Sequence, residues 1–116
     1  MKAQFRTKYG AVKIEINGRR FDSRKEGDRY RDLLLLEAAG EIHCLELQPR
    51  YELQAAFNHR GTKYRAISYT ADFRYWEKGD LVVEDVKSPP TRRKTDYVIR
   101  KKLFLKQHPE IVFKET

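Results

Sequence analysis

Apolar and polar residues alternate near the start of the chain. The alternation covers residues 12–16 and ends at Asn17-Gly18, a dipeptide typical of a tight hairpin turn. The return strand is then expected over residues 19–21. The pattern predicts an N-terminal β-hairpin over about residues 11–21, placed before a core over about residues 21–116.

The spacing of apolar residues then changes from that of a strand to that of a helix. Ser23 and Glu26 have the spacing of a capping box at a helix N-terminus. Gly40 supplies a typical C-terminal stop. Between these signals, apolar side chains recur on one helical face at Tyr30, Leu33, Leu34 and Ala38. We therefore expect a helix that starts at Ser23 and ends at Gly40.

The middle of the chain is typical of strands separated by turn residues. Strands are expected over residues 42–47 and 51–57. Pro49 marks a bend or a sheet edge between them, because proline cannot donate a hydrogen bond to a β-ladder. A turn is expected over residues 58–61, and a longer alternating strand follows over residues 63–76.

A strand, a helix and a last short strand complete the pattern. A tight turn at 78–80 leads into a strand over 81–87, whose apolar start is typical of a central position in a sheet. Ser88-Pro89-Pro90 stops that strand, a helix follows over about 95–108, and a strand covers 111–113. This order predicts an α/β (α+β) protein with a mixed central sheet flanked by helices.

The composition fits a single domain over residues 1–116. Hydrophobic residues make up 40% and charged residues 36%, so the chain can bury one core beneath a highly charged surface. The longest apolar run, 33–36, is far too short for a membrane span, and residues 1–8 lack the apolar core of a signal peptide. Cys44 is the only cysteine, which excludes an internal disulfide and a cysteine-based zinc site. We expect a cytoplasmic protein.

The net charge of +8 is concentrated in one segment of the chain. Residues 87–106 contain eight Lys or Arg and one acid, whereas residues 1–86 contain sixteen basic and fourteen acidic residues. Such a positive segment suits a nucleic-acid partner, although a solvated lysine-rich helix has the same composition. The candidates for phosphate contacts are Arg92, Arg93, Lys94, Lys101 and Lys102.

The long expected strand carries one acid among its apolar residues. Strict alternation places Tyr69, Ala71 and Phe73 on one face of this strand. Asp72 then lies on the opposite face. There it could hold a cation or pair with an arginine.

The next expected strand places an acid and a lysine two residues apart. Residues at this spacing point to the same side, so Asp85 and Lys87 share a face, and Glu84 faces away as a surface or helix-contacting acid. The preceding turn makes this strand a neighbour of the strand that carries Asp72. Two carboxylates beside an ammonium suit Mg²⁺ and a phosphate, although Asp85 and Lys87 could form only an ion pair on an exposed sheet face.

Three further residues extend this candidate site. Glu26 falls on the helix face that should meet the core, where a metal would compensate its charge, but it fits a capping role equally well. Gln48 ends a strand, where its amide could hold a water or a phosphate, or could form only a strand-end hydrogen bond. The carbonyl of Val86 could add a metal ligand.

A site of this kind is suited to phosphodiester hydrolysis. The reaction near neutral pH needs an activated water and neutralised charge at the phosphate, and Mg²⁺ can supply both. Asp72 and Asp85 would bind the metal, for which Mn²⁺ is an alternative ion. Lys87 would orient the attacking water and offset developing charge.

The residues that carry this chemistry resemble a known superfamily. Glu26 on a helix, Asp72 on a strand and Asp85-Val86-Lys87 on the next strand resemble the PD-(D/E)XK nucleases. The Gln-Pro and Asp-Phe elements are similar to the endonuclease subunits of some transposases, and the superfamily includes Holliday-junction resolvases. More closely, four segments look like a family of small phage and prophage endonuclease-like proteins: Phe21-Asp22-Ser23 with Glu26 and Tyr30, Leu45-Glu46-Leu47-Gln48-Pro49, Ala71-Asp72-Phe73, and Glu84-Asp85-Val86-Lys87.

The resemblance implies both a fold and a set of residue roles. The fold is a restriction-endonuclease-like core, built from a helix, a three-strand meander, a helix and a strand. Glu26, Asp72 and Asp85 correspond to metal ligands in this family. Lys87 corresponds to the catalytic lysine, and Gln48 corresponds to an auxiliary residue of the site.

Two positions depart from the pattern of that family. Ser88-Pro89-Pro90 follows the lysine where the family usually has a glycine, and Gly27 follows the helix acid where it usually has an alanine. Both departures leave the acids and the lysine intact. The first leaves open how DNA would pass over this loop.

The sequence therefore predicts a Mg²⁺-dependent DNA endonuclease of phage or mobile-element DNA processing or recombination, in the cytoplasm of a bacterial host cell. DNA is the expected partner, while a homodimer and partner proteins of recombination or replication stay open. The alternative is a non-catalytic nucleic-acid-binding module that retains the nuclease fold.

Overall fold

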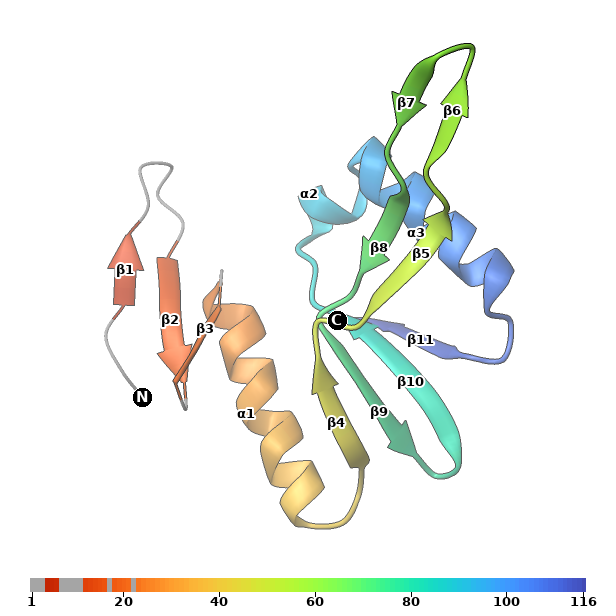
Figure 1. The fold of residues 1–116 in the computed structure, drawn as a ribbon. Coiled ribbons are helices and arrows are strands. Elements are labelled where there is room, and N and C mark those ends of the chain that lie inside the picture. Colours follow the sequence, from red (N-terminus) through yellow and green to blue (C-terminus); the bar gives the residue numbers. More distant parts are fainter. Residues whose placement is uncertain (1–3, 7–11, 17, 22) are drawn as a thin grey trace.

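The structure of the chain is a computed structural model. It describes residues 4–6, 12–16, 18–21 and 23–116 (Figure 1). In chain order the elements are β1 (Gln4–Arg6), β2 (Val12–Ile16), β3 (Arg19–Phe21), α1 (Arg24–Ala38), β4 (His43–Leu47), β5 (Arg50–Gln54), β6 (Phe57–His59), β7 (Thr62–Tyr64), β8 (Ile67–Thr70), β9 (Phe73–Glu77), β10 (Asp80–Asp85), α2 (Pro89–Arg92), α3 (Thr95–Gln107) and β11 (Val112–Glu115). None of the described helices is long and apolar enough to cross a membrane.

A four-stranded mixed sheet forms the centre of the fold. Its strand order is β11-β10-β9-β4, with β10 parallel to β11 and antiparallel to β9. The expected central position of β10 is therefore confirmed, as is the mixed sheet. The strand ends at Asp85, two residues before the predicted end. Its pairing nevertheless continues, because Lys87 N donates to Thr116 O (3.0 Å) and Thr116 N donates to Asp85 O (2.9 Å).

Apolar side chains pack on both faces of this sheet. Along β10, Val82 points into a cluster with α1, and its neighbour Val83 points into a cluster with α3. The first cluster contains Ile16, Phe21, Tyr30, Leu33, Ile42, Phe73, Tyr75 and Val82. The second contains Leu53, Tyr69, Ala71, Val83, Tyr97, Phe104 and Ile111.

The N-terminal hairpin and the first helix agree with their predictions. β2 and β3 pair antiparallel, although Asn17 of the expected turn lies outside the described residues. Phe21 of β3 packs against Tyr30 of α1, with ring centroids 5.0 Å apart. Ser23 caps α1, because its Oγ accepts a hydrogen bond from Glu26 N (3.1 Å). β1 pairs with β2 and adds a third strand to this hairpin. The sequence pattern did not predict β1.

The prediction of one long strand over residues 63–76 is wrong, because the chain forms three strands there, β7, β8 and β9. β7 pairs with β6, β8 pairs with β5 to form a separate two-stranded ribbon, and β9 alone joins the central sheet. The predicted turn over residues 58–61 is shorter, since β6 runs to His59. Alternation alone cannot show that consecutive strands belong to different sheets.

The alternation of side chains also breaks at Ala71-Asp72. Tyr69 and Ala71 point into the cluster with α3, whereas Phe73 points into the cluster with α1, so the predicted common face of these three residues is wrong. The chain bends there as it leaves the ribbon. The neighbouring segment, which connects β4 to β5, bends at Gln48-Pro49. Two backbone hydrogen bonds join the two bends: Gln48 N donates to Asp72 O (2.9 Å), and Ala71 N donates to Pro49 O (3.1 Å).

The C-terminal part of the chain differs from the prediction by one short helix. α2 covers Pro89–Arg92, within the segment expected only to stop a strand. Proline is favourable in a first helical turn, because its fixed φ fits the helix and its missing N–H would have no helical partner there. α3 and β11 lie within two residues of their predicted bounds.

Candidate active site at the bend of the central sheet

The candidate site lies where the ribbon β5–β8 leaves the central sheet. Asp72 occupies this bend, and its backbone N donates to Glu84 O (3.2 Å). Its side chain is fixed as well, because Asp72 Oδ2 accepts a hydrogen bond from Val86 N (2.7 Å). The carboxylate is therefore held beside the segment that carries Asp85 and Lys87.

Lys87 connects two of the predicted acids. Its Nζ lies 2.7 Å from Asp85 Oδ1 and 3.8 Å from Asp72 Oδ2. Asp85 and Lys87 share a face, as their spacing predicts. Burial opposes the charge of the lysine, but the hydrogen bond to Asp85 and the charge of Asp72 raise the pKa of Lys87 above its ordinary value. The ammonium form is therefore the stable form at the site.

Asp85 is fully buried, and both of its carboxylate oxygens have donors. Lys87 bonds to Oδ1, and the hydroxyl of Tyr69 on β8 donates to Oδ2. Burial and the neighbouring negative charge raise the pKa of Tyr69, so its hydroxyl keeps its proton. The alternation of the sequence placed Tyr69 only on a strand face opposite Asp72 and gave it no role at the site. The signal it missed is that a buried tyrosine hydroxyl needs a polar partner.

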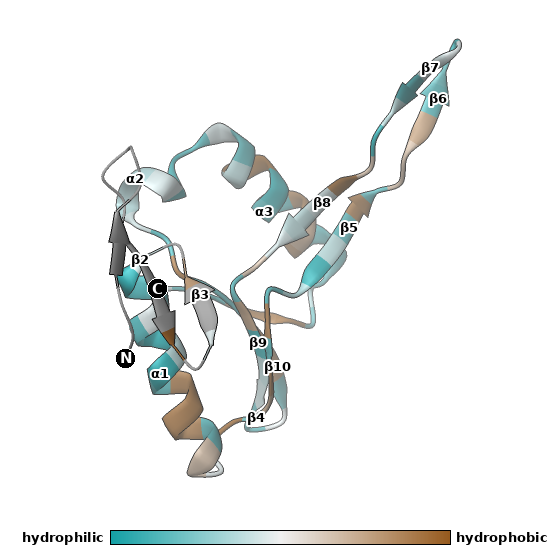
Figure 2. Ribbon diagram, turned by 60° about the vertical axis from the view of Figure 1, so that its left-hand side comes forward, coloured by the Kyte–Doolittle hydropathy of each residue, from teal (hydrophilic) through white to brown (hydrophobic). Residues whose placement is uncertain are grey.

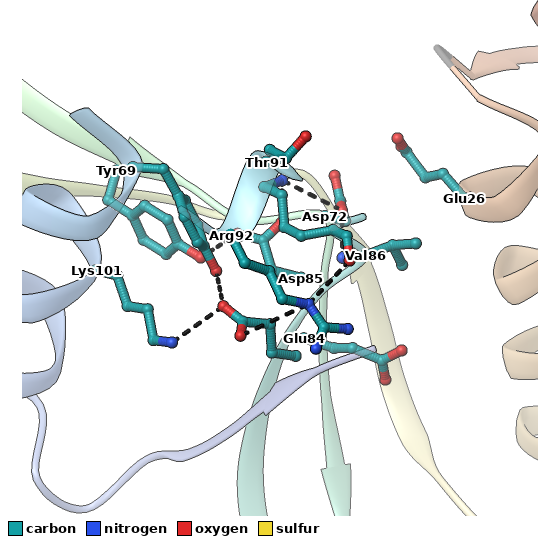
Figure 3. A network of polar contacts seen from close by, with 12 residues as sticks. Glu26, Tyr69, Asp72, Glu84, Asp85, Val86, Thr91, Arg92 and Lys101 are labelled. Atoms are coloured by element: carbon teal, nitrogen blue, oxygen red, sulfur yellow. Dashed lines mark hydrogen bonds and ion pairs between the residues drawn. The ribbon is translucent and has the colours of Figure 1, made fainter. Parts of the chain in front are cut away.

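Glu26 lies on the side of α1 that faces Asp72 (Figure 3). The two acids line one cavity of about 340 Å³, together with Val86 and Lys87. Burial, and then the negative charges of Asp85 and Glu26, raise the pKa of Asp72 to about 8, with Lys87 opposing the shift. The structure thus brings the three predicted acids and the lysine into one electrostatic cluster.

A second cavity lies on the other side of Lys87. It also has a volume of about 340 Å³, and Tyr69, Asp85, Lys94, Tyr97 and Arg100 are among its lining residues. Lys87 borders both cavities. Three cationic residues (Lys87, Lys94 and Arg100) and two acids (Asp85 and Asp96) line it, and this small positive excess suits an anionic group next to the acid cluster.

Glu84 faces away from the site, as predicted, and contacts helix α1. Its oxygens accept hydrogen bonds from Arg29 Nε (2.5 Å) and Nη2 (3.0 Å), from Tyr75 (2.6 Å) and from Thr116 Oγ1 (3.0 Å). Burial opposes its charge, but the bonds from Arg29 and Tyr75 lower the pKa of Glu84. This buried carboxylate therefore joins the sheet to α1.

The predicted basic residues divide into two groups. Arg92 Nε donates to Lys87 O (3.0 Å), and Lys101 Nζ lies 3.0 Å from Glu115 Oε2, so both have internal partners. The exposed members are Arg93, Lys94 and Lys102.

Gln48 contributes its backbone to the bend rather than its amide. Its N–H donates to Asp72 O, its φ of 52° lies in the left-handed region, and its side chain is exposed. The residue therefore fixes the backbone next to Asp72.

The donors at this site fit a hard divalent cation. Mg²⁺ prefers oxygen ligands and commonly uses only one or two carboxylates, keeping several waters. Asp72 and Glu26 meet that requirement at their shared cavity, while Asp85 lies behind Lys87 with both oxygens engaged. Within the described part of the chain, no three His, Cys, Asp or Glu side chains form a ready metal cage. The residues that would hold the ion are therefore Asp72 and Glu26; Val86 lines the same cavity, and Asp85 pairs with Lys87 at its border.

The chain was compared with known protein families, curated proteins and solved structures. A family model described as "Protein of unknown function (DUF1064)" matches residues 6–115, which includes every residue of the candidate site. No curated protein and no solved structure matches the chain.

Proposed function

The chain belongs to the DUF1064 family, and we propose that it is a Mg²⁺-dependent DNA endonuclease. The observation that carries the proposal is the position of Lys87, whose Nζ lies 2.7 Å from Asp85 Oδ1 and 3.8 Å from Asp72 Oδ2. Glu26 lines the same cavity as Asp72 and Lys87. Three acids grouped with one lysine at a cavity suit a site for a cation and a phosphate, and this grouping supports the proposal.

The order of elements supports a restriction-endonuclease-like core. α1 precedes the meander of β4, β9 and β10, and α3 and β11 follow it. This is the succession of helix, three-strand meander, helix and strand that PD-(D/E)XK nucleases share. The ribbon β5–β8 and the strands β6 and β7 are inserted between the first two strands of that meander.

The residues of the site divide the work of phosphodiester hydrolysis. Mg²⁺, when bound, supplies Lewis-acid activation of water and neutralises charge on the phosphate. Lys87 keeps its proton, so its ammonium offsets the negative charge that develops on the phosphate in the transition state. Tyr69 and the backbone N–H of Val86 hold the acids Asp85 and Asp72 in place. A nuclease with these features fits the processing or recombination of phage or mobile-element DNA.

Cleavage of plasmid DNA tests the proposal. Purified protein is incubated with supercoiled plasmid in Mg²⁺, in Mn²⁺ and in EDTA, and nicked and linear products are measured. Asp85→Asn should abolish cleavage, whereas Asp80→Asn should not, because Asp80 is an exposed residue at the other end of β10. Circular dichroism checks that both variants fold. No cleavage by wild-type protein, or equal cleavage by Asp85→Asn, would refute the proposal.

One observation favours a second candidate, a nucleic-acid-binding module without activity. Both oxygens of Asp85 already have hydrogen-bond donors in Lys87 and Tyr69, so the ion pair is complete without a metal. Such a module would bind DNA with strong salt dependence, would not respond to Mg²⁺ and would cut no substrate. The same plasmid assay, together with a binding assay in EDTA, separates the two candidates.

A further inference from the structure

A two-stranded arm extends the ribbon β5–β8 away from the body of the protein. We define the arm as residues 55–66, which include β6 and β7. Figure 1 shows β6 and β7 continuing beyond β5 and β8, and Figure 2 shows them standing clear of the helices and of the central sheet. Every residue from Ala55 to Arg65 is exposed. Packing against the core therefore does not explain why the arm is this long.

The arm is ordered by its own contacts. Phe57 and Tyr64 face each other across the two strands and stack, with ring centroids 5.0 Å apart and planes at 13°. Phe57 and Tyr64 are each 46% exposed as whole residues. At the tip, Asn58 Oδ1 accepts a hydrogen bond from Gly61 N (2.9 Å). These contacts stiffen a hairpin that would otherwise be only marginally stable.

The turn at the tip presents an arginine. Arg60 and Gly61 both have positive φ, 50° and 86°, which is the geometry of a type I′ hairpin turn. Asn, Asp or Gly adopts such a φ at lower cost than arginine. An exposed arginine therefore lies at the tip of the arm, where its guanidinium can bind a phosphate or a base edge.

The charge of the arm is entirely positive. Residues 53–70 contain Arg60, Lys63 and Arg65 but no Asp or Glu, in a chain that has 17 acids. This composition complements a polyanion and repels an identical arm of a second copy. The ribbon leads back to the candidate site, because Tyr69 on β8 bonds to Asp85. The second cavity, with Lys94 and Arg100, lies beside the same part of β8.

We propose that the arm enters a groove of duplex DNA whose backbone lies at the candidate site. The identification of DNA rests on the proposed function. A two-stranded ribbon fits the B-DNA major groove, which is about 12 Å wide. Gly61 lies eight residues from Tyr69, which is at most about 26 Å at ~3.3 Å per residue. One turn of DNA is about 34 Å long, so the site and the arm can contact one turn of the same duplex.

Binding without metal tests the arm separately from catalysis. Fluorescence anisotropy in EDTA measures the affinity for a labelled duplex of about 21 bp, which is two helical turns, over a range of salt concentrations. In a shortened variant, Asn-Gly replaces residues 55–66 and joins Gln54 to Ile67, which pair across the ribbon. We expect this variant to bind at least tenfold more weakly.

A pair of single substitutions supplies the matched control. Lys63→Gln should weaken binding and lower the salt slope by about 1, because one phosphate contact is lost. Lys78→Gln removes the same charge from the exposed turn between β9 and β10, at the other end of β9 from the bend, and should change neither. Circular dichroism and thermal melting confirm that each variant keeps the wild-type fold.

The possible outcomes separate the arm from the nuclease. The arm proposal fails if the shortened variant binds duplex with wild-type affinity and salt slope, or if wild-type protein does not bind duplex. It also fails if sedimentation shows that the arm instead joins two copies of the chain. Arm-dependent binding without any cleavage would refute the nuclease and keep the arm. Cleavage together with duplex binding that does not depend on the arm would refute the arm proposal and keep the nuclease.

Discussion

The hydroxyl of Tyr69 donates a hydrogen bond to Asp85 Oδ2, although the two residues lie on strands of different sheets. Tyr69 belongs to the ribbon β5–β8, and Asp85 ends the central strand β10. This bond attaches the base of the ribbon to the acid–lysine pair. It also determines how many oxygens of Asp85 are open to another ligand.

Removal of this hydroxyl should weaken the fold and open the site. Tyr69→Phe leaves one buried carboxylate oxygen without its donor, which should lower the free energy of unfolding by about 1–3 kcal/mol. Because Asp85 then has an open oxygen, Mg²⁺ should restore part of the lost stability. Urea denaturation with and without Mg²⁺ measures both effects. Tyr64→Phe, in the exposed arm, is the control and should change stability by less than about 0.5 kcal/mol.

Loss of the Lys87 charge should reduce catalysis far more than DNA binding. In Lys87→Gln no ammonium offsets charge on the phosphate, so the cleavage rate should fall about 10²–10³-fold. Affinity for duplex in EDTA should change little, because the exposed cations and the arm remain. Lys106→Gln on α3 is exposed and should cleave as wild type does. A rate for Lys87→Gln within threefold of wild type would contradict the assigned role.

The crowding of acids around Asp72 should make stability depend on pH. The folded protein raises the pKa of Asp72 to about 8, so folding favours the protonated form. This contribution is fully present below the unfolded pKa of about 3.9 and is lost as the pH rises through 8. Relative to wild type, Asp72→Asn should therefore gain stability with rising pH, at up to about 1.4 kcal/mol per pH unit.

Urea denaturation at pH 5 and at pH 9 measures that difference. Mg²⁺ at pH 9 should reduce it, because a cation would stabilise the ionised acids of wild-type protein only. Asp80→Asn, which removes an exposed carboxylate of β10, should show no such trend. A pH-independent difference between wild type and Asp72→Asn would show that Asp72 is not crowded by negative charge.

The pair of Arg29 and Glu84 should stabilise the fold without serving the site. Arg29→Gln leaves a fully buried carboxylate without its cation and should cost about 3 kcal/mol. The pKa of Glu84 is lowered in the folded protein, so its stabilisation exists above the unfolded pKa and is lost as the pH falls through the folded value. The acid sensitivity should therefore become weaker in Arg29→Gln.

Denaturation from pH 7 to pH 3 tests this pair. Arg24→Gln, on the exposed start of the same helix, is the matched control and should behave as wild type. Equal stability of the two arginine variants at pH 7 would contradict a structural role for the pair.

The sequence predicted best those features that depend on local spacing. Period-two alternation and turn residues were sufficient for the hairpin β2–β3, and capping signals for α1. The shared face of Asp85 and Lys87 also follows from spacing alone, and the backbone pairing with Thr116 extends that geometry beyond the end of β10.

Features that depend on distant partners could not be predicted. At Ala71-Asp72 the chain passes from the ribbon to the central sheet, beside the segment that connects β4 to β5. The alternation of residues along one strand cannot show such a change of sheet. The bond from Tyr69 joins two sheets, and Glu115 pairs with Lys101 across the space between β11 and α3. A positive segment in the sequence therefore overstates the cationic charge that is available to DNA.

The last strand has a consequence for the order of assembly during synthesis. Thr116 supplies the backbone partners of Asp85 and Lys87, and its hydroxyl bonds to Glu84. During synthesis a domain generally folds as one unit. A nascent chain that stops before residue 116 lacks these three hydrogen bonds, so the segment that carries Asp85 and Lys87 gains its backbone partner only once residue 116 is available.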